Sequence, residues 1–395
     1  MFENSTEGRR NAAQYIGPAS SPGMERQTNE AYTTMNAALR SNLRTALALV
    51  FLLVAASAHA TAQDAPAPAK VTVDADGKVH VPPLTIPGSS FLSPEAKAYL
   101  AQHLIQMQNP ELVKQDHGVP RFMTPYIERD SSLFAVEKRD FQIAGVHVYQ
   151  YTPKDGITPS NERRVLVNLH GGGFSGCWPA CAELESIPIA ALMHIKVITV
   201  DYREGPDNKF PAASEDVASV YSDLLKTYKP HNIGIYGCSA GGMLTAMSVA
   251  WFQVHGLPAP GAIGVYCASA GGFGGDAAYT AFPLGEASMP PAGPPGASAL
   301  GYFSTARMHD PLVSPLDSPA VLAKFPPTLL ITGTRDFAYS GAIYTHEQLV
   351  KLHVDAELHV WEGLFHGFFY NADVPESRDA FDVMINFFDR HLASD

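Results

Sequence analysis

Basic side chains are few in this sequence, and acidic side chains outnumber them. The 395 residues include 27 Lys and Arg against 39 Asp and Glu, which gives a formal net charge of −12. Binding to nucleic acid or to anionic membranes needs basic patches, so the composition argues against both kinds of partner. Charged residues make up only 17% of the chain and hydrophobic residues 46%, which is a globular composition with enough apolar material for a core.

Cysteines are also few. The chain has four, Cys177, Cys181, Cys238 and Cys267, and none of them forms a Cys-x-x-Cys pair. This excludes a disulfide framework and a paired-thiol zinc site. Cys177 and Cys181 are close in sequence on a Pro-containing loop, so they are expected either to form a disulfide in an oxidising compartment or to remain two free thiols.

The apolar run over residues 45–56 is too short for a comfortable transmembrane helix, which needs about 20 apolar residues. Arg44 precedes the run and Ala58-His59-Ala60 follows it. A basic start, an apolar centre and small residues at the end are typical of a signal peptide. We therefore expect cleavage near Ala60 or Ala62, export to the periplasm or the medium, and no stable membrane span afterwards. An uncleaved N-terminal anchor is the alternative.

Residues 1–34 are polar, lack a pattern and are too long for the basic start of a signal peptide. We expect translation of the natural protein to start at Met35, or at Met24. Residues 1–62 are thus predicted to be an N-terminal extension plus signal peptide. Residues 63–89, which begin rich in Ala and Pro, are predicted to be a linker.

The first helix of the mature chain is predicted to begin after Ser93. Ser93 suits an N-cap, and Pro94 suits the first helical position. Apolar residues follow at helical spacing as far as Met107, and Asn109-Pro110 ends the pattern.

From Lys138 onward, strand and helix patterns alternate. The predicted strands are 146–151, 164–169, 195–200, 233–236, 262–266, 328–331 and 357–361, and the predicted helices are 211–228, 243–252, 341–352 and 381–391. Strands separated by helices imply parallel pairing, so the predicted fold class is α/β, with a mostly parallel central sheet flanked by helices. Residues 271–310 are rich in Gly, Ala and Pro and are expected to form a long irregular insertion.

The segment Gly237-Cys238-Ser239-Ala240-Gly241 lies between a predicted strand and a predicted helix. Gly-x-Ser-x-Gly in this setting is the pattern of a nucleophile elbow, a tight turn that holds the serine in a strained conformation. The flanking glycines let neighbouring backbones approach, and the helix N-terminus favours developing negative charge. Ser239 is therefore the predicted nucleophile.

The segment His170-Gly171-Gly172-Gly173 follows the strand at 164–169. The backbone N–H groups of Gly172 and Gly173, together with that of Ala240, are predicted to form an oxyanion hole. Each such donor lowers the reaction barrier by about 3 kcal/mol. A flexible glycine loop without a catalytic role is the alternative.

Asp336 and His366 complete the predicted catalytic triad. In this arrangement the acid and then the base follow the serine along the chain. Asp336 comes directly after the strand at 328–331, and His366 lies between the last strand and the closing helix. The imidazole would accept the serine proton, and the carboxylate would fix the imidazole tautomer.

Other residues of the same types are weaker candidates for these roles. Asp310 and Asp317 are the rival acids, and His353 and His391 are the rival bases. Both histidines lie on or at the end of predicted helices, which is a poor location for a mobile base.

In these motifs the sequence resembles the hormone-sensitive-lipase-like branch of the α/β-hydrolases, which includes the bacterial family IV carboxylesterases. The resemblance extends from about Phe141 to the C-terminus. It rests on segments 170–174, 201–203 (Asp-Tyr-Arg), 210–213 (Phe-Pro-Ala-Ala), 237–242, 310–311 with 314–315, and 333–336 with 366.

The resemblance implies an α/β-hydrolase fold with a small cap, here residues 90–135, and a catalytic domain over residues 136–395 with an insertion near 276–308. It implies serine-dependent hydrolysis of short- to medium-chain carboxylic esters through an acyl-enzyme intermediate. The expected partner is a small-molecule ester substrate, and neither metal nor cofactor is expected.

The sequence departs from the family pattern at three places. Cys238 stands where the family usually has an acid, and it is either a small buried filler or a change that removes a charge beside the nucleophile. Glu204-Gly205-Pro206-Asp207 replaces the usual Leu-Ala-Pro-Glu, and segment 267–275 is unlike its counterpart. A lactone or sugar-acetate hydrolase, a serine peptidase of the same fold and a non-catalytic ligand-binding relative are therefore the alternatives to a simple esterase.

Overall fold

The computed structural model describes residues 70–116, 118–290 and 301–393. The chain divides into two compact units, residues 1–85 and residues 86–395. In the first unit, β1 (Thr72–Val73) pairs antiparallel with β2 (Val79–His80) within the segment predicted to be a linker. The predicted signal peptide and its cleavage sites lie outside the described residues. No helix in the described part of the chain is long and apolar enough to cross a membrane.

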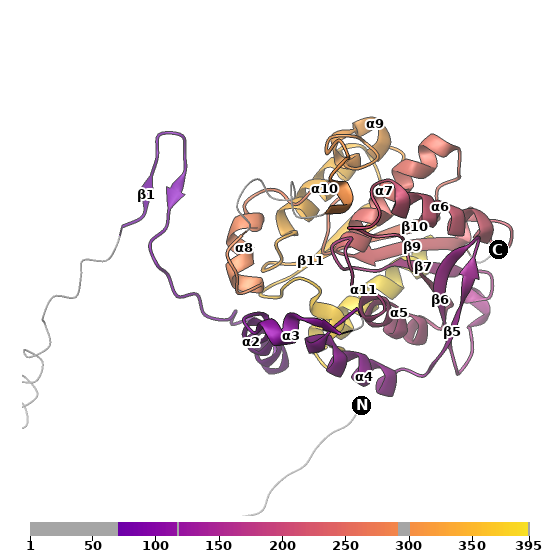
Figure 1. Ribbon diagram of the computed structural model, residues 1–395, viewed down its shortest axis with the longest axis horizontal. Helices are drawn as coiled ribbons and strands as arrows, with labels where there is room; N and C mark the ends of the chain where they lie inside the picture. The colour runs from indigo at the N-terminus through magenta and orange to yellow at the C-terminus, as the bar shows by residue number, and fades with distance from the viewer. Residues whose placement is uncertain (1–69, 117, 291–300, 394–395) are drawn as a thin grey trace, which may run out of the picture. The chain divides into compact units, whose positions relative to one another are not determined.

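The second unit is built around an eight-stranded sheet (Figure 1). Its strands are β5 (Val136–Ile143), β6 (Val146–Pro153), β7 (Val165–Leu169), β8 (Val197–Val200), β9 (Ile233–Cys238), β10 (Ala262–Tyr266), β11 (Thr328–Gly333) and β12 (Ala356–Trp361). Their order across the sheet is β12-β11-β10-β9-β7-β8-β6-β5. Only β6 pairs antiparallel with its neighbours, β5 and β8. The predicted α/β class with a mostly parallel sheet is confirmed.

The five strands from β7 to β11 are buried at every residue. Continuous burial of this kind arises when helices cover both faces of a parallel sheet, and it explains why these strands are plain apolar runs in the sequence. β5 was missed in the sequence because most of its residues are exposed. It forms a hairpin with β6 through a tight turn in which Ala144 and Gly145 both have positive φ.

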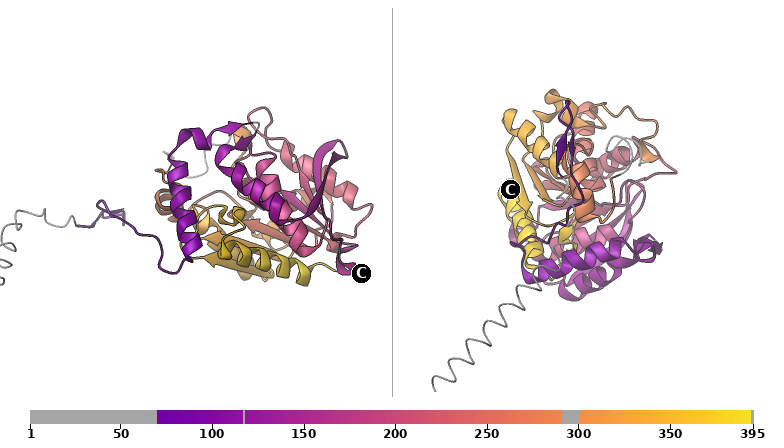
Figure 2. Two further views of the ribbon diagram at one scale, coloured as in Figure 1. Left: turned by 90° about the horizontal axis from the view of Figure 1, so that it is seen from below. Right: turned by 90° about the vertical axis from the view of Figure 1, so that its left-hand side faces the viewer.

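Helices cover both faces of the sheet (Figures 1 and 2). One face carries α5 (Ala180–Met193) and α11 (Pro375–His391), and α4 (Thr124–Leu133) packs on α5 and α2 (Pro94–Met107) on α11. The other face carries α6 (Ala212–Leu224), α7 (Ala240–His255) and α10 (Tyr339–Lys351). Shorter elements are α3 (Pro110–Val113), α8 (Ala277–Gly285), α9 (Pro319–Leu322) and the pair β3 (Gln115–Asp116) with β4 (Val119–Pro120).

The helices α5 and α8 differ from the sequence expectations for a physical reason. The helix α5 was missed because 11 of its 14 residues are buried, so it has no polar face to set against an apolar one. The expectation of an irregular insertion was wrong at α8, where small and apolar residues with an internal Pro283 form a helix without a readable period.

The predicted N-cap of α2 is confirmed. Ser93 Oγ accepts a hydrogen bond from the Ala96 N–H at 3.0 Å and donates one to Glu376 at 2.8 Å. This fixes the start of α2 against α11.

Candidate active site

Ser239 lies at the turn between β9 and α7. Its backbone has φ 58° and ψ −120°, a strained conformation for a non-glycine residue. A Cβ on Gly241 would lie 1.7 Å from the carbonyl oxygen of Leu169, and one on Gly237 would lie 2.1 Å from it. The two glycines therefore let the elbow pack directly against the end of β7. The serine itself is only partly buried.

Asp336 and His366 are brought together from the loops after β11 and β12. The His366 Nδ1 atom is 2.8 Å from Asp336 Oδ1, and the carboxylate is fully buried. Asp336 also accepts hydrogen bonds from the Thr332 hydroxyl and the Ala338 N–H, both at 2.9 Å. Phe337 stacks on the imidazole with ring centroids 4.2 Å apart. Because Nδ1 is bound to Asp336, Nε2 remains for proton transfer.

The acid and base shift each other's pKa. Burial alone would raise the pKa of Asp336, but the charge and hydrogen bond of His366 hold it below its ordinary value. Burial would lower the pKa of His366, but Asp336 raises it to about 9. In the described part of the chain, no hydrogen bond joins the Ser239 hydroxyl to the His366 ring. Such bonds are often open before substrate binds.

The predicted oxyanion residues lie on the glycine loop after β7 and at the start of α7. Gly172 and Gly173 have φ of +121° and +66°, and a Cβ on Gly172 would lie 1.8 Å from the Gly176 carbonyl oxygen. Ala240 is the first residue of α7. The glycines are thus required by the backbone path of the loop.

Glu185, on α5, is a residue of the site that the sequence analysis missed. It is 4% exposed, and its carboxylate accepts four hydrogen bonds. The donors are Asn168 Nδ2, the Gly171 N–H and the Tyr370 hydroxyl at 2.9 Å each, and the Cys238 N–H at 3.2 Å. Burial raises the pKa of Glu185 to about 7, although the four hydrogen bonds favour the charged carboxylate and lower the pKa. One carboxylate therefore connects the oxyanion loop, the nucleophile elbow and the loop after the base. An acid among the buried residues of a mainly apolar segment was the available signal.

Cys238 and Cys267 are buried free thiols beside the acid and base. Cys267 Sγ accepts a hydrogen bond from the Gly367 N–H at 3.3 Å. Cys267 Sγ, an oxygen of Asp336 and a nitrogen of His366 lie within 4.8 Å of one another, a set of atoms that could hold a metal ion. The Asp336–His366 hydrogen bond already uses two of these groups.

Cys177 and Cys181 form a disulfide, the first of the two expected states. The bridge joins the oxyanion loop to the first turn of α5. A Cβ on Gly172 would lie 2.8 Å from the Cβ of Cys177, so the bridge packs directly against the glycine loop.

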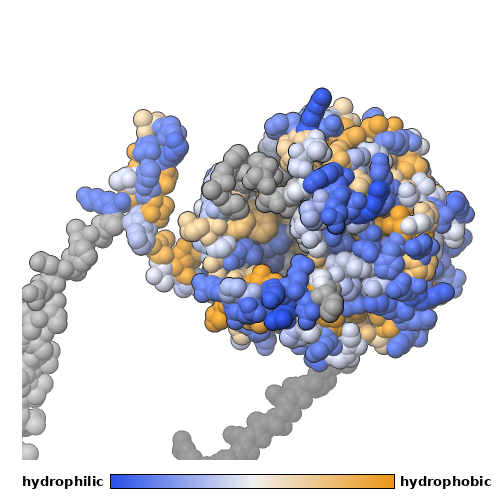
Figure 3. Space-filling model, viewed as in Figure 1, coloured by the Kyte–Doolittle hydropathy of each residue, from blue (hydrophilic) through white to orange (hydrophobic). Residues whose placement is uncertain are grey.

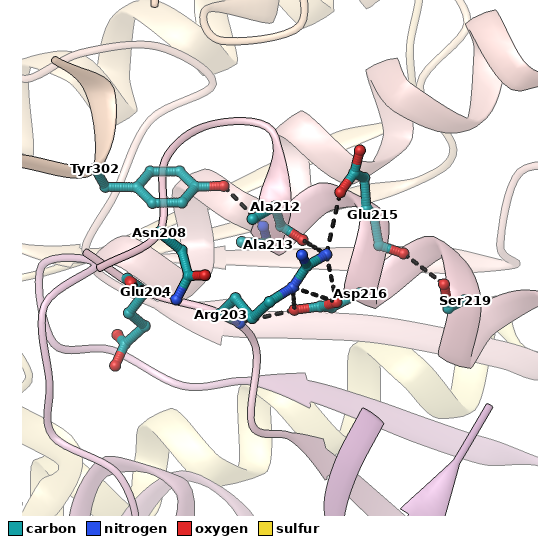
Figure 4. A network of polar contacts seen from close by, with 9 residues as sticks. All are labelled: Arg203, Glu204, Asn208, Ala212, Ala213, Glu215, Asp216, Ser219 and Tyr302. Carbon is teal, nitrogen blue, oxygen red and sulfur yellow. Dashed lines mark hydrogen bonds and ion pairs between the residues drawn. The ribbon is translucent and has the colours of Figure 1, made fainter. Parts of the chain in front are cut away.

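The loop after Asp201-Tyr202-Arg203 is held by an ion-pair network (Figure 4). Arg203 Nε donates to both carboxylate oxygens of Asp216 at 2.9 Å, and its Nη2 donates to Glu215 at 3.1 Å. Figure 4 shows the Glu204 carboxylate pointing away from this network. Its Oε1 is buried without a hydrogen-bond partner, and burial raises the pKa of Glu204 to about 8.

The rival acids make other contacts. Asp310 accepts a hydrogen bond from the Leu312 N–H, and Asp317 lies 3.0 Å from His309.

The rival bases lie outside the triad loops. His353 is exposed after α10, and His391 ends α11.

The arrangement has the parts needed for acyl transfer. It combines a serine on a strained elbow, an imidazole oriented by a buried carboxylate, and a loop of glycines with positive φ. The three residues occur along the chain in the order serine, acid and histidine, and each follows a strand. Both features agree with this chemistry.

Comparison with known proteins finds relatives among the α/β-hydrolases. Residues 166–370 match the family model described as alpha/beta hydrolase fold. An acetyl-hydrolase of Streptomyces hygroscopicus is 26% identical over 222 residues, which cover 56% of this chain and 73% of that protein. An esterase of Acinetobacter venetianus is 24% identical and is matched over 86% of its length by 66% of this chain.

Solved structures of esterases share the fold of this chain. The crystal structure of the esterase E25 superposes with a TM-score of 0.69 at 30% identity, over 79% of this chain and 98% of that chain. An esterase of the bacterial hormone-sensitive lipase family has a TM-score of 0.64 at 24% identity, over 76% and 99% of the two chains, and shares the fold.

Proposed function

This chain belongs to the alpha/beta-hydrolase fold family. We propose that it is a member of the hormone-sensitive-lipase-like branch and hydrolyses carboxylic esters with Ser239 as nucleophile. Ser239 Oγ attacks the ester carbonyl carbon while His366 Nε2 takes the hydroxyl proton. The N–H groups of Gly172, Gly173 and Ala240 donate to the oxyanion.

The attack gives a tetrahedral intermediate, which collapses to an acyl-enzyme that water then hydrolyses. The alcohol leaves with the proton held by His366, and an acyl-enzyme on Ser239 remains. Water, deprotonated by the same imidazole, attacks the acyl carbon and releases the acid.

The observation that carries the proposal is the 2.8 Å hydrogen bond between His366 and the buried Asp336. The two residues follow consecutive strands and are 30 positions apart in sequence, so the fold brings them together. A buried carboxylate on Nδ1 is the arrangement that makes an imidazole a base for a serine.

We expect short- to medium-chain acyl groups as substrates. The test is hydrolysis of p-nitrophenyl esters from acetyl to decanoyl by the purified protein beside Ser239→Ala. Activity that disappears in the variant supports a serine esterase, and the best chain length reports the depth of the acyl pocket. If neither protein hydrolyses any of the esters, the proposal is contradicted. An amide analogue that is cleaved faster than its ester would favour a peptidase.

We also propose that the protein is exported, with cleavage near Ala60 or Ala62. The Cys177–Cys181 disulfide supports an oxidising compartment. N-terminal sequencing of the native protein tests this. A mature product that keeps residues 2–30 contradicts both the cleavage and the translation start at Met35.

A further inference from the structure

The imidazole of the base is held from two directions. In its own plane, His366 Nδ1 lies 2.8 Å from Asp336 Oδ1. On its face lies the ring of Phe337, with the two ring centroids 4.2 Å apart and the ring planes inclined by 21°. Phe337 directly follows Asp336, so the loop after β11 supplies both contacts. The acid fixes which nitrogen faces it, and the stacked ring limits tilting of the imidazole.

Two further aromatic rings hold Phe337 in this position. Phe282 of α8 stacks on Phe337 with ring centroids 4.7 Å apart and ring planes inclined by 22°. Phe273, which precedes α8, meets Phe337 edge to face at 5.1 Å and 83°. In the space-filling view, the surface at α8 carries hydrophobic residues (Figure 3). Phe337 is therefore supported from an apolar part of the molecule and has little freedom to turn away from the imidazole.

A ring in this position interacts differently with the two protonation states of His366. The face of an aromatic ring is negative, and it attracts a cation that lies within about 6 Å of the ring centroid. The neutral imidazole lacks the charge on which this attraction depends. The His366 side chain is only 17% exposed, and the attraction is stronger where water is partly excluded. The stacked Phe337 ring therefore favours the imidazolium over the neutral imidazole.

The titratable groups that face His366 come from four other segments. Burial lowers the pKa of His366, and the charge and hydrogen bond of Asp336 raise it. Cys238, at the end of β9, and Glu286, after α8, raise it further by their electrostatic effect. Burial lowers the pKa of His103 of α2 to about 4, so this neighbour stays neutral. A neutral ring on the face of the imidazole can be altered while all four groups stay in place.

We propose that Phe337 is a positioning residue that acts through His366, with its ring face stabilising the imidazolium that forms as Ser239 gives up its proton. The inference rests on the proposed esterase function and adds a residue to its mechanism. The proton passes from Ser239 Oγ to His366 Nε2 and then to the leaving alcohol, and no bond to Phe337 forms or breaks. The imidazole is neutral before the attack and charged in the transition state, so a contact that prefers the charged form lowers the barrier.

The test replaces Phe337 with monofluoro-, difluoro- and trifluorophenylalanine by suppression of a stop codon in the full chain. Fluorine withdraws electrons from the ring face and changes the size of the ring very little. Titration of the acid released from methyl butanoate gives kcat/KM between about pH 6 and pH 10 for each protein. The same amino acids at Phe141, an exposed ring on the edge strand β5, are the matched control. Phe337→Leu, which removes the ring, completes the series.

Each added fluorine is expected to lower the kcat/KM that is reached at high pH and to move its rise to lower pH, because the imidazolium loses stabilisation. The trifluoro protein should lose about tenfold in this limiting kcat/KM, and its midpoint should fall by about one pH unit, as loss of a partly desolvated cation–π contact predicts. Phe337→Leu should show both effects. The Phe141 series should keep the wild-type profile.

A fluorinated Phe337 series that keeps the wild-type rates and midpoint overturns the inference and leaves this ring a packing role, whatever Phe337→Leu does. A fall in rate without a shift of the midpoint overturns it too. Hydrolysis of methyl butanoate that survives Ser239→Ala, or no hydrolysis of any ester by the wild type, overturns the proposed function instead. If Phe337→Leu does not fold, the fluorinated series decides alone, since its rings are nearly equal in size.

Discussion

The hydroxyl of Tyr370 donates a 2.9 Å hydrogen bond to Oε1 of Glu185, the same oxygen that accepts the Gly171 N–H. Tyr370 follows the loop of the base, and Gly171 belongs to the oxyanion loop. The other carboxylate oxygen accepts the N–H of Cys238, next to the nucleophile. Glu185 thus acts as a positioning residue for three catalytic segments that are far apart in sequence.

Glu185→Leu is expected to lower kcat at least about tenfold with a smaller change in KM, because a displacement of the oxyanion donors weakens binding of the transition state. Each N–H left buried without an acceptor also costs about 1–3 kcal/mol of stability. Steady-state kinetics and urea unfolding measure the two effects.

Matched variants separate positioning from stability. Glu185→Gln keeps one acceptor oxygen and should fall between wild type and the Leu variant, and Tyr370→Phe should lose only one of the four bonds. A Leu variant that unfolds more easily but keeps the wild-type kcat would make the role of Glu185 purely structural.

Gly172→Ala is expected to lower kcat by about 100-fold, the cost of one lost oxyanion donor. The new Cβ would lie 1.8 Å from the Gly176 carbonyl oxygen at φ +121°, so the loop must move. Gly272→Ala is the control, since a Cβ there meets nothing within 4 Å. Comparable kcat values for the two variants would refute an oxyanion role for the loop.

Reduction of the Cys177–Cys181 bridge is expected to lower both stability and activity. The bridge closes a loop of only a few residues, so chain entropy gives about 2 kcal/mol at most. Cys177 also packs against Gly172, so loss of the bridge should lower kcat as well as stability. Cys181→Ser should show the same losses and no further response to reductant, measured by thermal unfolding and ester hydrolysis. If the unreduced wild type has the same unfolding temperature and the same kcat as Cys181→Ser, the bridge contributes to neither, which contradicts this prediction.

The sequence was sufficient for the parts of the molecule that are governed by local pattern. The buried central strands are apolar runs, and the elbow at Ser239 needs glycines at fixed positions. Asp336 and His366 could be selected because each directly follows a strand, and parallel strands end at the same edge of the sheet.

Residues whose roles depend on distant contacts could not be found in this way. Glu185 acquires its role from Asn168 and Tyr370, which lie in other elements, and its helix α5 has no amphipathic period. Gly285 contacts the loops of the acid and the base because α8 forms within a segment whose sequence shows no helical period.

The pH dependence of kcat/KM should follow the pair Asp336 and His366. The imidazole must be neutral to accept the Ser239 proton, and the Asp336 charge outweighs burial and raises the pKa of His366 to about 9. Since the protonated form predominates below that pH, kcat/KM is expected to rise with pH, to reach half of its maximum near pH 9 and to level only above that pH. Asp336→Asn removes the charge that raises the pKa, so the rise should move to lower pH while the maximal rate falls about 10⁴-fold. Asp317→Asn, which removes the partner of the exposed His309, should leave the profile unchanged. A rise that stays at the same pH in Asp336→Asn would mean that another group titrates, and His366 would lose its assignment as the base.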